Sequence, residues 1–289
     1  MTATVGIKPC DVLVTGASSG LGRAIAHALA SKGHNVVGTS RRAGVPESIV
    51  TGKLTMAPLN VDQDASVEAL LALLEKFAFA PDVLVLNAGF GSAGSLEGCS
   101  VASAKRQFET NFFGVHRMVR AFLPSLRQSG SGRIIVVGSL GGILPLPFQG
   151  MYSASKFALE AYVDVLILET AMHGIQATLL QPGDFATGFT ANRAAPDSAA
   201  HAAYEPAMSN VLRIMADHEE HGRDSQILGD LVCRLLEKQK LKTRYKVGSV
   251  AETIIANLAG RVPRGWILAI LRSLYQVPGR PTPPPGINQ

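Results

Sequence analysis

The segment from residue 10 to residue 33 constrains the fold of this 289-residue chain more than any other. A short apolar run, Cys10–Thr15, leads directly into three closely spaced glycines: Gly16, Gly20 and Gly22. Small apolar residues then recur at helical spacing as far as Lys32-Gly33, a cation and a glycine suited to ending a helix. A strand, a glycine loop and a helix in this order are typical of a dinucleotide-binding unit, because the glycines let backbone N–H groups at the helix start approach a pyrophosphate.

The residues of this loop are our first candidate cofactor-binding set: Gly16, Ser18, Ser19, Gly20, Leu21 and Gly22. The next predicted strand, Asn35–Thr39, ends in Ser40, Arg41 and Arg42, where an NAD-binding protein would place an acid to hold the ribose 2′-hydroxyl. Two guanidinium groups suit the 2′-phosphate of NADP by charge and by bidentate geometry. The alternative is that both arginines are solvated surface side chains. We predict NADP(H) as the cofactor.

Later apolar runs predict five more strands, at 54–59, 83–86, 133–138, 175–180 and 245–248. Helices are expected between them, at 65–77 with Asp64 as N-cap, at 101–127, from Tyr152 to Met172, and at 226–238. The alternation predicts an α/β fold: one Rossmann-type, doubly wound domain over 1–289, with a mainly parallel seven-stranded sheet, helices on both faces and a C-terminal helical cap. We expect a cofactor-binding core at about 10–183, a substrate lid and C-terminal extension at about 184–277, and a flexible tail at 278–289.

Several small or polar residues fall at the carboxyl ends of predicted strands, where open parallel sheets bind ligands. They are Asn60, Val61, Asn87, Ala88, Gly89, Ser139, Pro182 and Gly183. Tyr152 and Lys156 follow, four residues apart on one helical face. A free tyrosine has a pKa of about 10, and a nearby lysine cation favours the tyrosinate, so the pair is built like a general acid/base. Asn111 lies in mid-helix, where asparagine is unfavourable; it is either a satisfied buried amide or a functional residue.

In this order the motifs resemble those of the short-chain dehydrogenase/reductase family over most of the chain. The matching features are Thr15-Gly16-x3-Gly20-x-Gly22, Asn87-Ala88-Gly89, Asn111, Ser139, Tyr152-x3-Lys156 and Pro182-Gly183. The resemblance implies that Tyr152 exchanges a proton with the substrate oxygen, that Lys156 holds the nicotinamide ribose and assists Tyr152, and that Ser139 binds the substrate oxygen. It also implies that Asn111 positions a water molecule in a proton relay, and that Asn87 and its neighbours border the adenosine.

One position departs from the family pattern. Family members usually carry an aspartate where this chain has Asn60, and its carboxylate accepts a hydrogen bond from the adenine amino group. An amide oxygen can accept too, although it is uncharged and must be oriented correctly. We therefore expect a small loss of cofactor affinity and no effect on the chemistry.

Composition excludes several other classes of protein. The net charge is +5, but the basic residues are scattered and no tract predicts nucleic-acid binding. Three distant cysteines (Cys10, Cys99 and Cys233) and the histidines His201, His218 and His221 predict neither a disulfide framework nor a metal site. With no apolar signal region and no run of 18 apolar residues, we expect a cytoplasmic protein.

The C-terminal third bears on the substrate. Arg244-Tyr245-x-Val247-Gly248 resembles the branch of the family that holds hydroxysteroid and retinol dehydrogenases, which act on lipophilic ketones and alcohols. Candidate pocket residues are Leu140, Leu144, Leu146, Phe148, Phe185 and Phe189. The apolar segment 263–277, with its basic residues, either packs over the substrate cleft or touches a membrane surface peripherally.

The expected function is therefore NADP(H)-dependent interconversion of a lipophilic ketone or aldehyde and an alcohol, of the steroid, retinoid or long-chain class. Two alternatives remain open: a non-catalytic NADP-binding sensor or scaffold, and an epimerase or dehydratase of the same superfamily. The family resemblance also implies a homodimer or homotetramer built through the helices at about 101–127 and 152–173.

Overall fold

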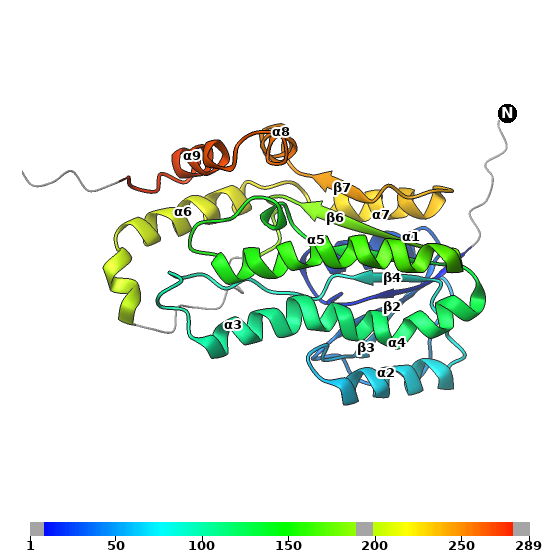
Figure 1. Ribbon diagram of the computed structural model, residues 1–289. Helices are drawn as coiled ribbons and strands as arrows, with labels where there is room; N and C mark the ends of the chain where they lie inside the picture. Colours follow the sequence, from blue (N-terminus) through cyan, green and yellow to red (C-terminus); the bar gives the residue numbers. More distant parts are fainter. Residues whose placement is uncertain (1–8, 189–198, 280–289) are drawn as a thin grey trace, which may run out of the picture.

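The fold is a parallel β-sheet with helices on both faces (Figure 1). The computed structural model describes residues 9–188 and 199–279. Seven strands form one sheet in the order β3-β2-β1-β4-β5-β6-β7, and every neighbouring pair is parallel. Their bounds are Asp11–Val14 (β1), Asn35–Ser40 (β2), Leu54–Pro58 (β3), Val83–Leu86 (β4), Gly132–Val137 (β5), Ile175–Pro182 (β6) and Arg244–Val247 (β7). The predicted fold class is confirmed, with strand ends shifted by one or two residues.

Two apolar cores hold the helices against the sheet. Because side chains alternate along a strand, Val83 and Val85 of β4 enter one core while Leu84 and Leu86 enter the other. The first core lies under α1 (Gly20–Ser31) and α7 (Gln226–Glu237). The second lies under α2 (Asp64–Lys76), α4 (Gly114–Ser129) and α5 (Gly150–Thr170).

The strand order places the switch point of the sheet between β1 and β4. From β1 the chain builds outward to β2 and β3, and it then returns to add β4, β5, β6 and β7 on the other side. The loops after β1 and β4 therefore leave the sheet in opposite directions and open a crevice at their carboxyl ends. This is where the glycine loop and Asn87-Ala88-Gly89 lie.

A third apolar cluster forms the cap over this crevice. It joins α6 (Ala207–Glu220), α8 (Val250–Leu258) and α9 (Arg264–Leu274) to the short 3₁₀ helix η2 (Leu140–Gly142) after β5. Figure 1 shows α8 and α9 along the edge of the molecule beyond β7. Neither α6, which lies in a polar part of the sequence, nor α8 was among the predicted helices.

The predicted helix 101–127 differs in detail. The segment is helical, but it consists of α3 (Val101–Phe108), a π-helical turn η1 (Glu109–Phe113) and α4. Asn111 therefore lies in a π turn, a feature common at functional sites. The prediction that Asp64 is an N-cap is wrong. Gln63 holds that position, and Asp64 is the first helical residue, where its carboxylate pairs with the Arg117 guanidinium at 2.6 Å.

Two expectations fall on parts of the chain that lie outside the described residues. They are the pocket residue Phe189 and the tail from residue 280 onward. Among the helices that the structure describes, none is both long and apolar enough to cross a bilayer.

Candidate active site

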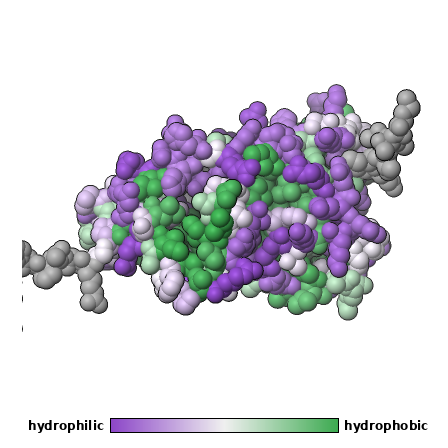
Figure 2. Space-filling view, turned by 90° about the horizontal axis from the view of Figure 1, so that it is seen from above, coloured by the Kyte–Doolittle hydropathy of each residue, from purple (hydrophilic) through white to green (hydrophobic). Residues whose placement is uncertain are grey.

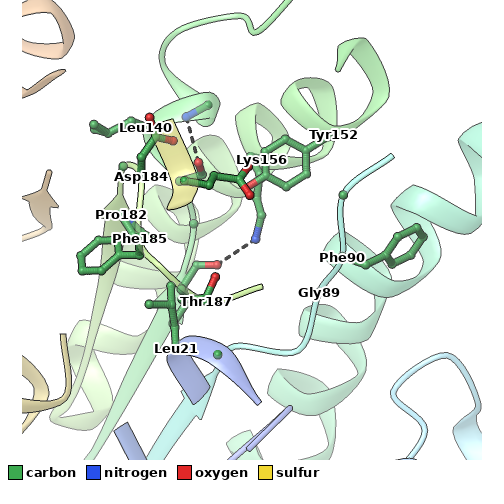
Figure 3. Close-up of a pocket in the computed structure, with 18 of the residues that line it drawn as sticks. Leu21, Gly89, Phe90, Leu140, Tyr152, Lys156, Pro182, Asp184, Phe185 and Thr187 are labelled. Carbon is green, nitrogen blue, oxygen red and sulfur yellow. Dashed lines mark hydrogen bonds between the residues drawn. The ribbon is translucent and has the colours of Figure 1, made fainter. Parts of the chain in front are cut away.

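A cavity of about 890 Å³ occupies the carboxyl ends of the strands, beneath the cap. Most of the predicted site residues line it: Gly16, Ser18, Ser19, Gly20, Leu21, Ser40, Arg41, Asn60, Val61, Asn87, Ala88, Gly89, Ser139, Tyr152, Lys156, Pro182 and Gly183. Three do not, namely Gly22, Arg42 and Asn111. Figure 3 shows Tyr152 and Lys156 between the β6 end (Pro182 to Phe185) and the Gly89–Phe90 segment.

The glycine loop is held by Asn87. The Asn87 side-chain amide donates to the carbonyl oxygens of Thr15 and Gly16, at 3.1 and 3.2 Å. Gly16 has φ +68°, and a Cβ there would lie 2.9 Å from the Ala88 Cα. A Cβ at Gly22 would lie 2.3 Å from the Asn87 Nδ2, so Gly22 serves this packing and not the cavity wall. Asn87 thus fixes the conformation of the glycine loop through hydrogen bonds to its backbone.

The first turn of α1 presents a site for an anion. Its N-cap Ser19 makes no side-chain capping hydrogen bond, and the turn contains no acidic residue. The positive end of the helix therefore faces a cavity lined by Ser18, Ser19 and Gly20. This arrangement, together with the space that the glycines leave, fits the pyrophosphate of a nicotinamide dinucleotide.

The two arginines after β2 are separated by the fold. Both side chains are exposed, but Arg41 lines the cavity beside Ser40 whereas Arg42 lies outside it. At the end of β3, Asn60 Oδ1 accepts from the Asp62 backbone N–H at 3.3 Å. Asn60, which stands where the family pattern has an aspartate, therefore closes a local turn with its side chain.

The Ser139 hydroxyl is oriented by the backbone. Ser139 is the N-cap of η2, and its Oγ accepts from the Gly141 N–H at 2.9 Å. Because that bond uses an oxygen lone pair, the hydroxyl proton stays available for donation to a substrate oxygen. Tyr152 lies in the first turn of α5, with only 8% of its surface exposed. A Cβ added at Gly141 would lie 3.2 Å from both the Ser139 Oγ and the Tyr152 Cε1, so the hydroxyl and the phenol ring are neighbours.

Lys156 is buried one turn further along α5. Its Nζ donates to the Val137 carbonyl oxygen at 3.0 Å and lies 6.0 Å from the centroid of the Tyr152 ring. Burial lowers the pKa of Lys156 to about 8. The ammonium is therefore held at a desolvation cost beside the phenol.

Asn111 lies behind the cavity and not in it. Its side chain is fully buried; Oδ1 accepts from the Phe90 N–H at 3.0 Å, and Nδ2 donates to the Phe90 carbonyl and to Ser155 Oγ. These bonds tie the Gly89–Phe90 segment to α5 across the π turn. The implied role in a water relay stays a prediction.

The structure adds Glu252, which sequence reasoning missed. Glu252 lines the cavity, and its carboxylate accepts from the Asp184 N–H at 2.8 Å and from the Ser249 N–H at 2.6 Å. One side chain thus caps α8 and also fixes the turn after Pro182-Gly183. The local signal was Ser249-x-x-Glu252, a capping-box pattern.

The part of the cavity beneath the cap has both apolar and charged lining residues, and the charged ones include Asp217, Glu219 and Arg223. Four predicted pocket residues line it, Leu140, Leu144, Leu146 and Phe185, together with residues from the cap: Met215, Ile255, Leu271, Leu274 and Tyr275. Phe148 does not line the cavity; it packs at the edge of the third core, against Tyr204. The polar lining includes Asp184, whose Oδ2 lies 3.7 Å from His218 Nδ1. No group of His, Cys, Asp and Glu among the described residues could hold a metal ion.

Comparison with known proteins identifies the class that this site defines. The family model "short chain dehydrogenase" matches residues 11–198. The chain belongs to the short-chain dehydrogenase/reductase family and is an oxidoreductase of that family.

Two curated relatives are informative. A 3-ketodihydrosphingosine reductase from Bacteroides thetaiotaomicron is 36% identical over 94% of this chain and 100% of its own length. Human retinol dehydrogenase 8 is 38% identical, over 63% of this chain and 60% of its own. The latter agrees with the predicted resemblance to the branch that holds retinol dehydrogenases.

Solved structures agree on the fold. A short-chain dehydrogenase from Streptomyces avermitilis superposes with a TM-score of 0.76 at 29% identity, covering 93% of this chain and 96% of that one. An alcohol dehydrogenase from Thermococcus sibiricus, 27% identical with a TM-score of 0.67 over 84% and 97% of the two chains, is complexed with 5-hydroxy-NADP. A Burkholderia phymatum family member, 22% identical with a TM-score of 0.71 over 98% and 99%, is in complex with NAD.

Proposed function

We propose that this protein is an NADP(H)-dependent reductase of long-chain ketones. The observation that carries the proposal is the convergence, in one cavity, of Ser139, Tyr152 and Lys156 with the positive end of α1 and a group of apolar residues from the cap. The Arg41 guanidinium, which lines the same cavity, supports NADP over NAD by its charge.

A bound nicotinamide supplies the hydride. The Ser139 O–H donates to the ketone oxygen and orients the carbonyl, because its own oxygen is already held by the Gly141 N–H. The Tyr152 phenol donates its proton to the oxygen as negative charge develops there. The Lys156 ammonium, next to the phenol, stabilises the tyrosinate that remains until a proton returns from solvent.

Among long-chain ketones, the class to which 3-ketodihydrosphingosine belongs is the first candidate. That compound carries an amine beside its ketone and a long alkyl chain. Asp184 lines the cavity directly after Pro182-Gly183, so its carboxylate can pair with an ammonium near the reacting carbonyl, while the apolar residues of the cap contact the chain. The relative named for this substrate and Asp184 both support the assignment.

The test is a panel of substrates, with turnover measured as the loss of NADPH absorbance at about 340 nm. The panel compares 3-ketodihydrosphingosine with the matching long-chain ketone without the amine, a retinoid aldehyde and a ketosteroid. We expect turnover of the first, and a rise in its KM of at least about tenfold in Asp184→Asn with no change for the plain ketone. Asp230→Asn, at an exposed carboxylate on α7 outside the cavity lining, is the matched control. Turnover of the retinoid or the steroid alone would reassign the substrate class, and NADPH binding without turnover of any compound would favour a sensor.

A further inference from the structure

The outward faces of α8 and α9 are apolar. On α8 the exposed side chains are Val250, Ile254 and Leu258, and on α9 they are Trp266, Leu268, Ile270 and Leu274. The spacings 250-254-258 and 266-270-274 place each set of three along one side of its helix. We call these two sets of three the α8–α9 face; Leu268, two positions from both Trp266 and Ile270, is exposed on another side of α9. Figure 2, which views the molecule from the side of α8 and α9, shows apolar surface there, bordered by hydrophilic residues.

This face is too apolar for an ordinary surface. Val250 is 78% exposed, Trp266 69% and Ile254 53%. Single exposed apolar residues are common, but a contiguous group with polar borders marks a contact surface. The inner side of α9 already packs against the protein, because Ile267 and Leu271 are buried in the third core.

The charge of the segment indicates what it contacts. From Thr253 to Gln289 the chain contains no aspartate or glutamate, and its only charged residues are four arginines: Arg261, Arg264, Arg272 and Arg280. Arg261, Arg264 and Arg272 are exposed, on or beside α9. The Arg261 guanidinium also donates to the Asn257 carbonyl oxygen, and the Arg264 guanidinium lies over the Phe157 ring, so Arg272 is the arginine chosen for the test below. Apolar side chains including a tryptophan, with arginines beside them and no acid, complement a bilayer that carries anionic headgroups.

The face is also continuous with the substrate cavity. Leu274 is 42% exposed and at the same time lines the cavity, as do Ile255 of α8 and Leu271 of α9. A lipophilic molecule could pass from an acyl-chain environment along these side chains to the cavity without crossing water. Helices that only covered the cleft would not need apolar side chains running from the outer surface to the cavity.

We propose that the α8–α9 face docks on the surface of an anionic lipid bilayer and that the cavity opens toward that bilayer. Docking is independent of the proposed reaction; only the delivery of a lipid substrate from the membrane rests on the proposed function.

The single tryptophan of the chain, Trp266, lies in the α8–α9 face and provides the probe. The full chain is titrated with vesicles of phosphatidylcholine containing about one third phosphatidylglycerol, while Trp266 emission is recorded. We expect a blue shift, quenching by lipids brominated in the acyl chain, and weaker binding to pure phosphatidylcholine or at high salt.

Variants distinguish docking through this face from non-specific adsorption of the protein to lipid. Ile254→Asp and Ile270→Asp should each weaken vesicle binding at least about tenfold, because an apolar contact is replaced by a charge that anionic lipid repels. Val45→Asp, at a more exposed apolar residue (70%) away from this face, is the matched control and should bind as the wild type does. Arg272→Gln should weaken binding to anionic vesicles about fivefold and leave binding to neutral ones unchanged. Unchanged thermal midpoints establish that the variants fold.

Three outcomes would overturn the proposal. They are the absence of any blue shift with vesicles, equal binding by Ile254→Asp, Ile270→Asp and Val45→Asp, and a blue shift that follows protein concentration without lipid, which would assign the face to a second copy of the chain. Failure of the proposed function is scored separately, by turnover of detergent-solubilised 3-ketodihydrosphingosine in the absence of vesicles.

Discussion

Replacing the buried Lys156 by methionine should stabilise the cofactor-free protein at neutral pH while abolishing its activity. The folded protein lowers the pKa of this lysine from 10.5 to about 8 because the ammonium is desolvated. A difference of about 2.5 units at about 1.4 kcal/mol each corresponds to a cost of about 3 kcal/mol. Methionine removes that cost and also removes the hydrogen bond to the Val137 carbonyl, which costs about 1 kcal/mol. The net gain is about 2 kcal/mol.

The sign of the pH dependence follows from linkage. Between pH 8 and about 10.5 the unfolded wild type binds the lysine proton more tightly than the folded one, so the free energy of unfolding rises with pH in this window. Below pH 8 the full cost is present. The advantage of Lys156→Met should therefore be largest near pH 7 and shrink as the pH approaches 10.

The assay is urea unfolding without cofactor, followed by circular dichroism at several pH values from 7 to 10. The difference between wild type and Lys156→Met isolates this one group from all other titrations. Lys53→Met, at an exposed lysine, is the matched control for the loss of a surface lysine and should change the free energy of unfolding at pH 7 little. The reasoning is refuted if Lys156→Met is less stable than wild type at pH 7 by an amount that does not change with pH.

Three further predictions follow from the geometry. Arg41→Ala should weaken NADPH binding about ten- to a hundredfold and NADH binding much less, whereas Arg42→Ala, outside the cavity, should have a small effect on both. Fluorescence titration with both cofactors checks this, and equal losses of NADPH and NADH affinity in Arg41→Ala would contradict the NADP assignment. Arg244→Met should lower the free energy of unfolding by about 1–2 kcal/mol at pH 7, because Arg244 bridges β7 to Glu160 and Asp164 of α5. The Arg244 hydrogen bond lowers the pKa of Asp164, so this loss should shrink below about pH 4 as Asp164 becomes protonated; urea unfolding at pH 7 and in acid measures it. Leu168→Asp with Met172→Asp should convert a homo-oligomer to monomers in light scattering, since these side chains, in α5 and just beyond its end, are 77% and 83% exposed; an unchanged mass would exclude this face as the interface.

Much of the site could be predicted because its parts are local in sequence. The glycine loop follows a strand and opens a helix, and Tyr152 and Lys156 share one helical face, so short-range spacing is sufficient. The parallel sheet brings the ends of β1, β4 and β5 to one edge, which places Ser139 opposite the first turn of α5. These features depend on periodicity and chain order alone.

The remainder depends on contacts between distant residues. Nothing in the sequence near Asn87 shows that its amide holds the carbonyls of Thr15 and Gly16, which are more than 70 residues away. Nothing local separates Arg41 from Arg42, because the direction of the loop after β2 decides which one enters the cavity.

The missed cap helices illustrate a second reason. In α6 the buried Met208, Val211 and Met215 are spaced for one helical face, but His218, Glu219 and other polar residues mask the pattern. That helix is stabilised by packing against α9 and η2 in the third core and not by intrinsic propensity. The signal for α8 was present in Ser249 and Glu252 and could have been read.

The central claim is that Tyr152 supplies the proton in reduction of a ketone by NADPH. The most direct measurement is the single-turnover rate of NADPH oxidation by Tyr152→Phe with a turned-over ketone, alongside the Kd of NADPH. We predict a rate lower by at least about a hundredfold with NADPH affinity nearly unchanged, since the ring remains and only the proton donor is removed. A rate within a few-fold of wild type would contradict the account.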